Sequence, residues 1–91
     1  MVVWSATARA DLIRIFDFNI ERGDARAHHV ELRIAEQAEM IGQHPLIGRK
    51  TRRKDVREWT IADVQYVLRY QMSDPIEIVR VFSTRENRGM L

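Results

Sequence analysis

Apolar side chains recur at two different periods along this chain, and the period changes near residue 45. From Ala8 to Phe16 and from Ala27 to Ile41 they recur every three or four residues, which is the spacing of an amphipathic helix. Beyond Val56 the period falls to two, the alternation of a strand whose two faces differ. We therefore expect two helices in the first half of the chain and strands in the second.

Residues with capping and turn chemistry mark where the helices begin and end. We expect Ser5 to cap the first helix, Gly23 to end it in a left-handed turn and Asp24 to cap the second. A turn this short makes the two helices antiparallel. The charged residues of the first helix are expected to face water; they are Arg9, Asp11, Arg14 and Asp17.

Pro45 lacks an amide donor and restricts the residue before it, so the second helix cannot continue past it. The expected strands are Val2–Trp4 at the start and, after Pro45, Val56–Ile61, Tyr66–Met72 and Ile76–Phe82. The predicted fold class is α+β: a strand, an antiparallel helix hairpin and then a three-stranded antiparallel sheet. We expect one two-layer domain over residues 1–91, with the helices covering one sheet face.

Length and composition exclude several classes of protein. The 91 residues contain no cysteine, so we expect neither disulfides nor thiolate chemistry. No apolar run reaches the ~18 residues of a membrane span, and the N-terminus lacks the pattern of a signal peptide. These features predict a cytoplasmic protein that does not act at a membrane.

Positive charge is concentrated in one part of the chain. Residues 49–57, which we call the basic segment, hold six basic residues and one acidic residue, a net charge of +5. Because the whole chain carries only +2, the remainder is net negative. A concentrated patch attracts phosphate or an acidic protein surface better than scattered charge does. The alternative is a solvated loop without a partner.

The residues that usually carry metal or cofactor chemistry are not arranged for it. His28 and His29 are neighbours on a helix, so they point about 100° apart and cannot share a metal, and His44 stands alone beside Pro45. Neither a pair of buried carboxylates nor a glycine-rich nucleotide motif is evident. We therefore predict no metal and no cofactor.

An ordered set of residues carries a resemblance to a known family. The set comprises Trp4-Ser5 before a helix with Ala8, Asp11, Leu12 and Ile15; Pro45, Gly48 and Arg49; Arg57, Trp59 and Ile61; Tyr66, Leu68 and Tyr70; and Ile78-Val79-Arg80-Val81 with Arg85. At this spacing the chain resembles the ParE branch of the RelE/ParE toxin superfamily. The resemblance implies a type II toxin that inhibits DNA gyrase, either alone or on DNA. It also implies a cognate antitoxin that binds and neutralises this toxin in a hetero-oligomer.

The RelE branch of the superfamily implies an alternative, a ribosome-dependent mRNA endoribonuclease. In that branch two lysines and an arginine on the strand hairpin act on the RNA, and their positions here hold Glu58, Thr60 and Val67. Only the arginine after the last strand has a match, at Arg85, and no tyrosine follows Tyr70. Since Glu58 places an acid where phosphate would bind, these departures favour the ParE reading, in which the toxin has no catalytic site. A non-toxic binding module of the same fold is a third possibility.

The candidate residues for binding the target are cations. They are Arg57 and Arg85, which match positively charged family positions, and Arg49, Arg52, Arg53 and Lys54 of the basic segment. The alternative for Arg57 and Arg85 is pairing with a neighbouring acid, Glu58 or Glu86. The aromatic residues Trp59, Tyr66 and Tyr70 are expected to pack in the core or across strands. The sequence does not identify the residues that would bind an antitoxin.

Overall fold

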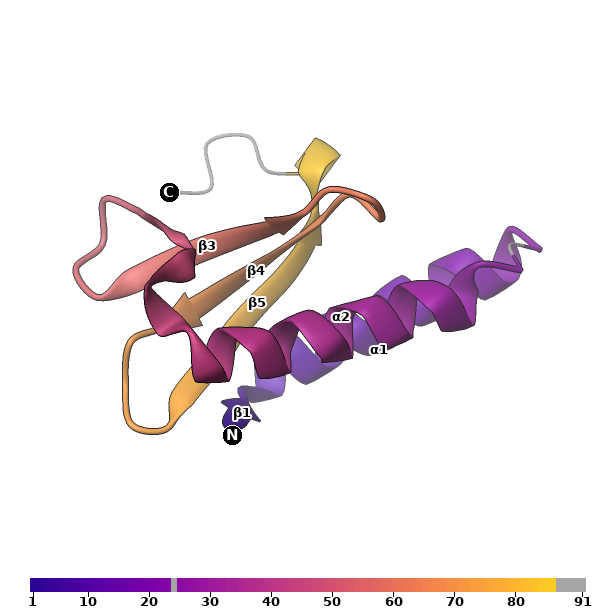
Figure 1. Ribbon diagram of the computed structural model, residues 1–91. Helices are drawn as coiled ribbons and strands as arrows, with labels where there is room; N and C mark the ends of the chain where they lie inside the picture. The colour runs from indigo at the N-terminus through magenta and orange to yellow at the C-terminus, as the bar shows by residue number, and fades with distance from the viewer. Residues whose placement is uncertain (24, 87–91) are drawn as a thin grey trace.

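Two layers make up the fold, a five-stranded sheet and a helix hairpin that crosses one of its faces (Figure 1). The computed structural model describes residues 1–23 and 25–86. Its elements are β1 (Val2–Trp4), α1 (Ala6–Glu21), α2 (Ala27–Gln43), the 3-10 turn η1 (Pro45–Ile47), β2 (Arg49–Lys50), β3 (Val56–Ile61), β4 (Tyr66–Gln71), β5 (Ile76–Ser83) and the 3-10 turn η2 (Thr84–Glu86). The strand order β1-β5-β4-β3-β2 places β4 at the centre.

The predicted α+β class and element order are confirmed, and the sheet is larger than expected. The three antiparallel strands are β3, β4 and β5, as predicted. β1 extends the sheet by pairing in parallel with β5, from Val2 opposite Ile76 to Trp4 opposite Ile78. β2 extends the other edge, since Arg49 and Lys50 pair with Glu58 and Arg57 instead of lying in a loop. Part of the basic segment is therefore fixed to the sheet.

Ser5 caps α1 as predicted and also ties it to the last strand. Its hydroxyl oxygen accepts a hydrogen bond from the Ala8 amide at 3.0 Å and donates to the Val79 carbonyl at 3.1 Å. The Ser5 amide donates to the Ile78 carbonyl at 2.9 Å. Gly23 adopts φ +68°, the predicted left-handed turn, and the expected cap Asp24 lies outside the described residues.

The core lies between the hairpin and the sheet. The predicted stripe of α2 is buried throughout, and it packs with the inward-facing side chains of β3, β4 and β5. The buried members on the helices are Ala8, Ile15, Val30, Ile34, Ala38 and Ile41, and those on the strands include Ile61, Leu68, Tyr70, Ile78 and Val81. Tyr66 and Tyr70 are core residues as predicted, and the partly buried Trp59 donates its indole N–H to Gln37 Oε1 at 2.7 Å.

Asp11 corrects one prediction, because it is only 5% exposed instead of facing water. It lies beside the stretch of β5 beyond the end of β1, where the strand edge needs an acceptor. Its Oδ2 accepts from the Val81 amide at 2.8 Å and from Arg80 Nε at 2.9 Å. Burial raises the pKa of Asp11, but the bonds from Arg80, Val81 and Arg14 outweigh it, so the pKa falls below its usual value.

Candidate functional site

The basic segment begins at a tight junction around Gly48. The Tyr70 hydroxyl donates to the Pro45 carbonyl at 2.6 Å and accepts from the Gly48 amide at 2.9 Å. A side chain at Gly48 would not fit, since a Cβ there would lie 2.5 Å from the Tyr70 hydroxyl and 2.8 Å from the Glu58 carbonyl oxygen. Burial raises the pKa of Tyr70, partly opposed by the Gly48 amide and Arg57, so the hydroxyl stays protonated and able to donate.

Arg57 donates hydrogen bonds to the backbone of this junction and does not pair with Glu58. Its Nη1 donates to the Gly48 carbonyl at 2.7 Å and to the Leu46 carbonyl at 3.2 Å. The expected alternative, a pair between Arg57 and Glu58, is therefore wrong, because the two side chains point to opposite faces of β3. The guanidinium is half-buried and fixes the approach of η1 to the sheet.

Glu58 is a buried acid that holds two arginines. Its side chain is fully buried, and Oε2 lies 2.9 Å from Arg69 Nε and 2.8 Å from Arg69 Nη2. Its Oε1 accepts from Arg49 Nη2 at 3.1 Å, which fixes the first cation of the basic segment. The Arg69 guanidinium also lies over the Phe82 ring, 4.9 Å from its centroid. Arg69 was not predicted, although the register of a hairpin closing between Ile61 and Tyr66 places it opposite Glu58.

The remaining cations of the basic segment face solvent. Arg52, Arg53 and Lys54 are exposed on a loop whose backbone is fixed, since the Asp55 carbonyl accepts from the Met72 amide at 2.7 Å. Beside them lies a hollow of about 420 Å³, whose lining includes four cations and one acid; they are Lys50, Arg53, Lys54, Arg57 and Asp55. An acidic or phosphate-bearing surface could therefore meet several cations at once.

Arg85 lies at the other end of the strands, away from the rest of the predicted set. It belongs to η2, which follows Ser83, and Ser83 pairs with Tyr66 at the start of β4. The expected pair between Arg85 and Glu86 is wrong: Glu86 contacts Arg14 Nη1 at 3.4 Å and accepts from the Ser83 amide at 2.9 Å. The structure thus places five of the six candidates at one end of the sheet, with Arg49 and Arg57 on opposite faces, and separates Arg85 from them.

Comparisons with known proteins agree on the family. The sequence model described as "ParE toxin of type II toxin-antitoxin system, parDE" matches residues 2–88. The chain belongs to the ParE toxin family. A relative, "Putative toxin Y4kP" of Sinorhizobium fredii (strain NBRC 101917 / NGR234), is 32% identical over 68 residues, covering 74% of this chain and 71% of that protein. A solved structure described as "Chromosomal ParDE TA system from P. aeruginosa" shares the fold, with a TM-score of 0.78 and 23% identity over 90% of this chain and 92% of that one.

Within this ParE fold, the positions of the RelE-type nuclease residues fall on the sheet face opposite the helices. Thr60 and Val67 are directly opposed on β3 and β4, and Glu58 lies two residues along on the same face. Glu58 is already neutralised by Arg69 and Arg49. These positions therefore offer no cation to a scissile phosphate.

Metal-binding clusters and membrane-spanning helices are both absent from residues 1–23 and 25–86. No group of three or more His, Cys, Asp or Glu side chains in that part of the chain is arranged to hold a metal ion. No helix there is long and apolar enough to cross a membrane.

Proposed function

We propose that this chain is the toxin of a type II toxin–antitoxin pair, that it arrests growth in the cytoplasm by inhibiting DNA gyrase, and that a cognate antitoxin neutralises it. The observation that carries the proposal is the buried ion pair of Glu58 with Arg69, whose oxygen and nitrogen atoms lie 2.8 Å apart. This ion pair lies on the sheet face that carries the RNA-cleaving residues in toxins of the RelE branch. Membership of the ParE family agrees with a toxin that acts by binding.

The basic segment is the surface proposed to bind the target. Arg52, Arg53 and Lys54 face solvent beside the half-buried Arg57, and this end of the sheet attracts DNA or an acidic protein. Because the loop backbone is fixed, little conformational entropy is lost on binding. Arg49 lies at the same end of the sheet but on the opposite face from Arg57, where one of its nitrogens donates to Glu58.

Exposed apolar side chains support a protein partner. Ile13 and Ile20 of α1 are 64% and 48% exposed, and Leu32 of α2 is 59% exposed. Leu46 and Ile47 add a second apolar area at the end of α2, next to the basic segment. An antitoxin segment that folds on binding could cover these surfaces with apolar side chains and meet the basic segment with acidic ones.

The proposal is tested by inducing the chain without an antitoxin and measuring two activities in parallel. We expect filamentous growth arrest with a DNA-damage response, inhibition of gyrase supercoiling by the purified chain, and no cleavage of ribosome-bound mRNA. Cut mRNA with intact DNA would support the RelE-type alternative. Normal growth despite folded, abundant protein would support the non-toxic binding module.

The antitoxin is tested with the product of the neighbouring gene. Co-purification at micromolar concentration, with ordering of a segment that is disordered when free, is expected. Absence of a complex would contradict neutralisation by that gene product.

A further inference from the structure

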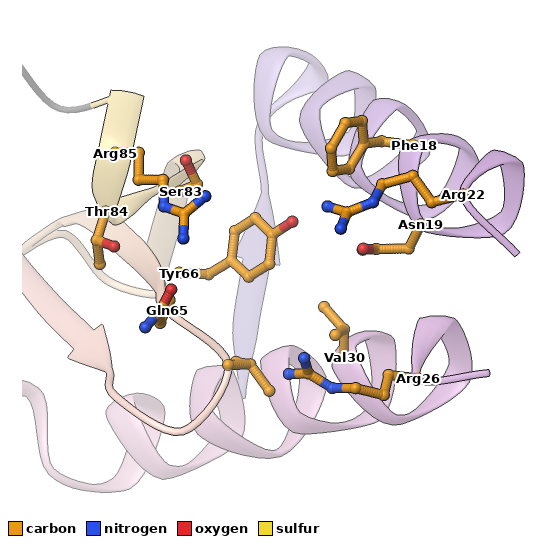
Figure 2. Close-up of a pocket in the computed structure, with 11 residues that line it drawn as sticks. Phe18, Asn19, Arg22, Arg26, Val30, Gln65, Tyr66, Ser83, Thr84 and Arg85 are labelled. Carbon is orange, nitrogen blue, oxygen red and sulfur yellow. The ribbon is translucent and has the colours of Figure 1, made fainter. Parts of the chain in front are cut away.

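A second cationic region lies where the open end of the helix hairpin meets the ends of the strands. Three arginines from separate elements line it: Arg22 after α1, Arg26 before α2 and Arg85 in η2 (Figure 2). We call it the arginine cleft. Its volume is about 290 Å³, at the low end of the roughly 300–1,000 Å³ of small-molecule sites. None of its described lining residues is acidic.

The floor of the cleft carries a hydroxyl group that bonds none of the other described residues. Tyr66 is only 8% exposed, and its ring packs in the core. Its hydroxyl points into the cleft in Figure 2 and makes no hydrogen bond to any other described residue. The hydroxyl oxygen is not among the fully buried polar atoms, so it is accessible from the cleft and can bond a ligand or water there. Ser83 and Thr84 line the same space with further hydroxyls.

Two of the three arginines are open to a ligand. Within the described part of the chain, neither Arg22 nor Arg85 forms an ion pair, and Arg22 lies over the Phe18 ring, 5.2 Å from its centroid. Figure 2 shows their guanidinium groups pointing toward the Tyr66 side chain from opposite sides. The wall that carries Arg85 is fixed, because the Thr84 amide donates to the Gln65 carbonyl at 2.9 Å. Guanidinium groups suit oxyanions, which accept two of their N–H groups at once.

We propose that the arginine cleft binds a phosphate group, either as free phosphate or as the phosphate of a small molecule such as a nucleotide. A phosphate offers oxygens in several directions and gains a second charge near neutral pH, which matches cations on opposite walls and a hydroxyl on the floor. A carboxylate has two oxygens in one plane and a single charge, so it leaves part of this donor set unused. The recess is also too small for a nucleic acid duplex. This site is independent of the gyrase proposal, whose surface lies at the other end of the strands.

The test titrates the purified chain with inorganic phosphate and follows Arg and Tyr side-chain signals by NMR. We expect saturable shifts at Arg22, Arg85 and Tyr66. Arg85→Gln should weaken binding about tenfold or more, because it removes a charge-assisted hydrogen bond. Arg9→Gln, which removes the same charge from the exposed start of α1 outside both cationic regions, should change affinity less than about twofold. Equal weakening by both variants would overturn the proposal, since it would indicate general attraction to a basic protein.

Further arms of the experiment identify the ligand class. Phosphate affinity should rise between about pH 6 and pH 8 as the second charge appears, whereas acetate and an acidic peptide should bind weakly throughout. Tighter binding of AMP or ATP than of phosphate would assign a nucleotide, and equal binding would assign phosphate itself. Preference for the acidic peptide, or no saturable binding of any probe, would overturn the proposal. If Arg85→Gln does not fold, Tyr66→Phe, which keeps the ring in the core, should still weaken phosphate binding.

Discussion

The basic segment and the arginine cleft are both cationic, and each adjoins a strand that a buried carboxylate, here called its anchor, fixes in the fold. Glu58 anchors the basic segment from a fully buried position, and its partner Arg69 is also buried, with 6% of its side chain exposed. Asp11 holds α1 against β5, the strand that leads into η2 and Arg85, but its partners Arg80 and Arg14 are 33% and 49% exposed. Arg14 in turn reaches Glu86 of η2, beside Arg85. The cost of losing each anchor therefore depends on whether its partners can turn to water.

Glu58→Ala should have the largest effect, because it leaves the Arg69 guanidinium buried without a counter-charge. We expect the free energy of unfolding to fall by about 3–5 kcal/mol, measured by urea denaturation. Glu36→Ala, an exposed acid on α2, is the matched control and should change stability by less than about 0.5 kcal/mol. A double variant, Glu58→Leu with Arg69→Met, should recover most of the loss, since no charge remains buried. A loss below about 1 kcal/mol in the single variant would refute the anchor role of Glu58.

Asp11→Ala should cost less, about 1–3 kcal/mol in the same measurement. The Val81 amide loses its acceptor, but Arg80 is partly exposed and can be solvated. Asp17→Ala on the exposed face of α1 is the control and should be nearly neutral. If Asp11→Ala proved as costly as Glu58→Ala, the exposure of the arginine partners would not determine the cost of losing each carboxylate.

The Asp11 anchor makes part of the stability of the fold depend on pH. The pKa of Asp11 is lowered in the folded chain, so its ionised form contributes stability above the unfolded value of about 4. That contribution is lost as the pH falls through the lower folded pKa. Denaturation between pH 5 and pH 2.5 should therefore show a smaller loss for Asp11→Asn than for the unmodified chain. The exposed Asp63, whose pKa Arg33 lowers, contributes in the same direction, but added salt should suppress its share. Identical pH slopes for Asp11→Asn and the unmodified chain would contradict the linkage.

Replacing Arg49, Arg52, Arg53 and Lys54 together by Ser should have the smallest effect on stability, below about 1 kcal/mol, because these cations are exposed. Target or antitoxin affinity should fall, and its salt dependence should flatten. The triple variant of Arg22, Arg26 and Arg85 to Gln removes a similar charge from the other region and tests which one the partner uses. Unchanged affinity and salt slope in the fourfold variant would leave these four cations a solvated surface and shift the functional weight to Arg57 and Arg85.

The layers of this fold follow from local signals, whereas both anchors depend on which strands become neighbours. The period of the α2 stripe and the Ser5 cap act within a few residues, so the sequence predicted them correctly. Asp11 was expected to face water although it falls on the buried side of α1 between Ala8 and Ile15. Its burial makes sense only once β1 ends at Trp4 and leaves the Val81 amide without a strand partner. The arginine cleft needs residues 22, 26 and 85 to meet, which no local pattern indicates.

The parallel pairing of β1 with β5 also has a consequence for the order in which the chain folds. Val2 and Ile76 are partners although 74 residues separate them, whereas the helix hairpin and the β3–β4 hairpin close over short loops. Contacts between residues far apart in sequence form late, because closing a long loop lowers the entropy of the chain before the contact contributes any stabilising free energy. We expect hydrogen-exchange labelling during refolding to protect β1 amides after those of α2 and β4. β1, which is synthesised before its partner β5, would then be the last strand to join the sheet, and a nascent chain would lack this pairing until β5 is available.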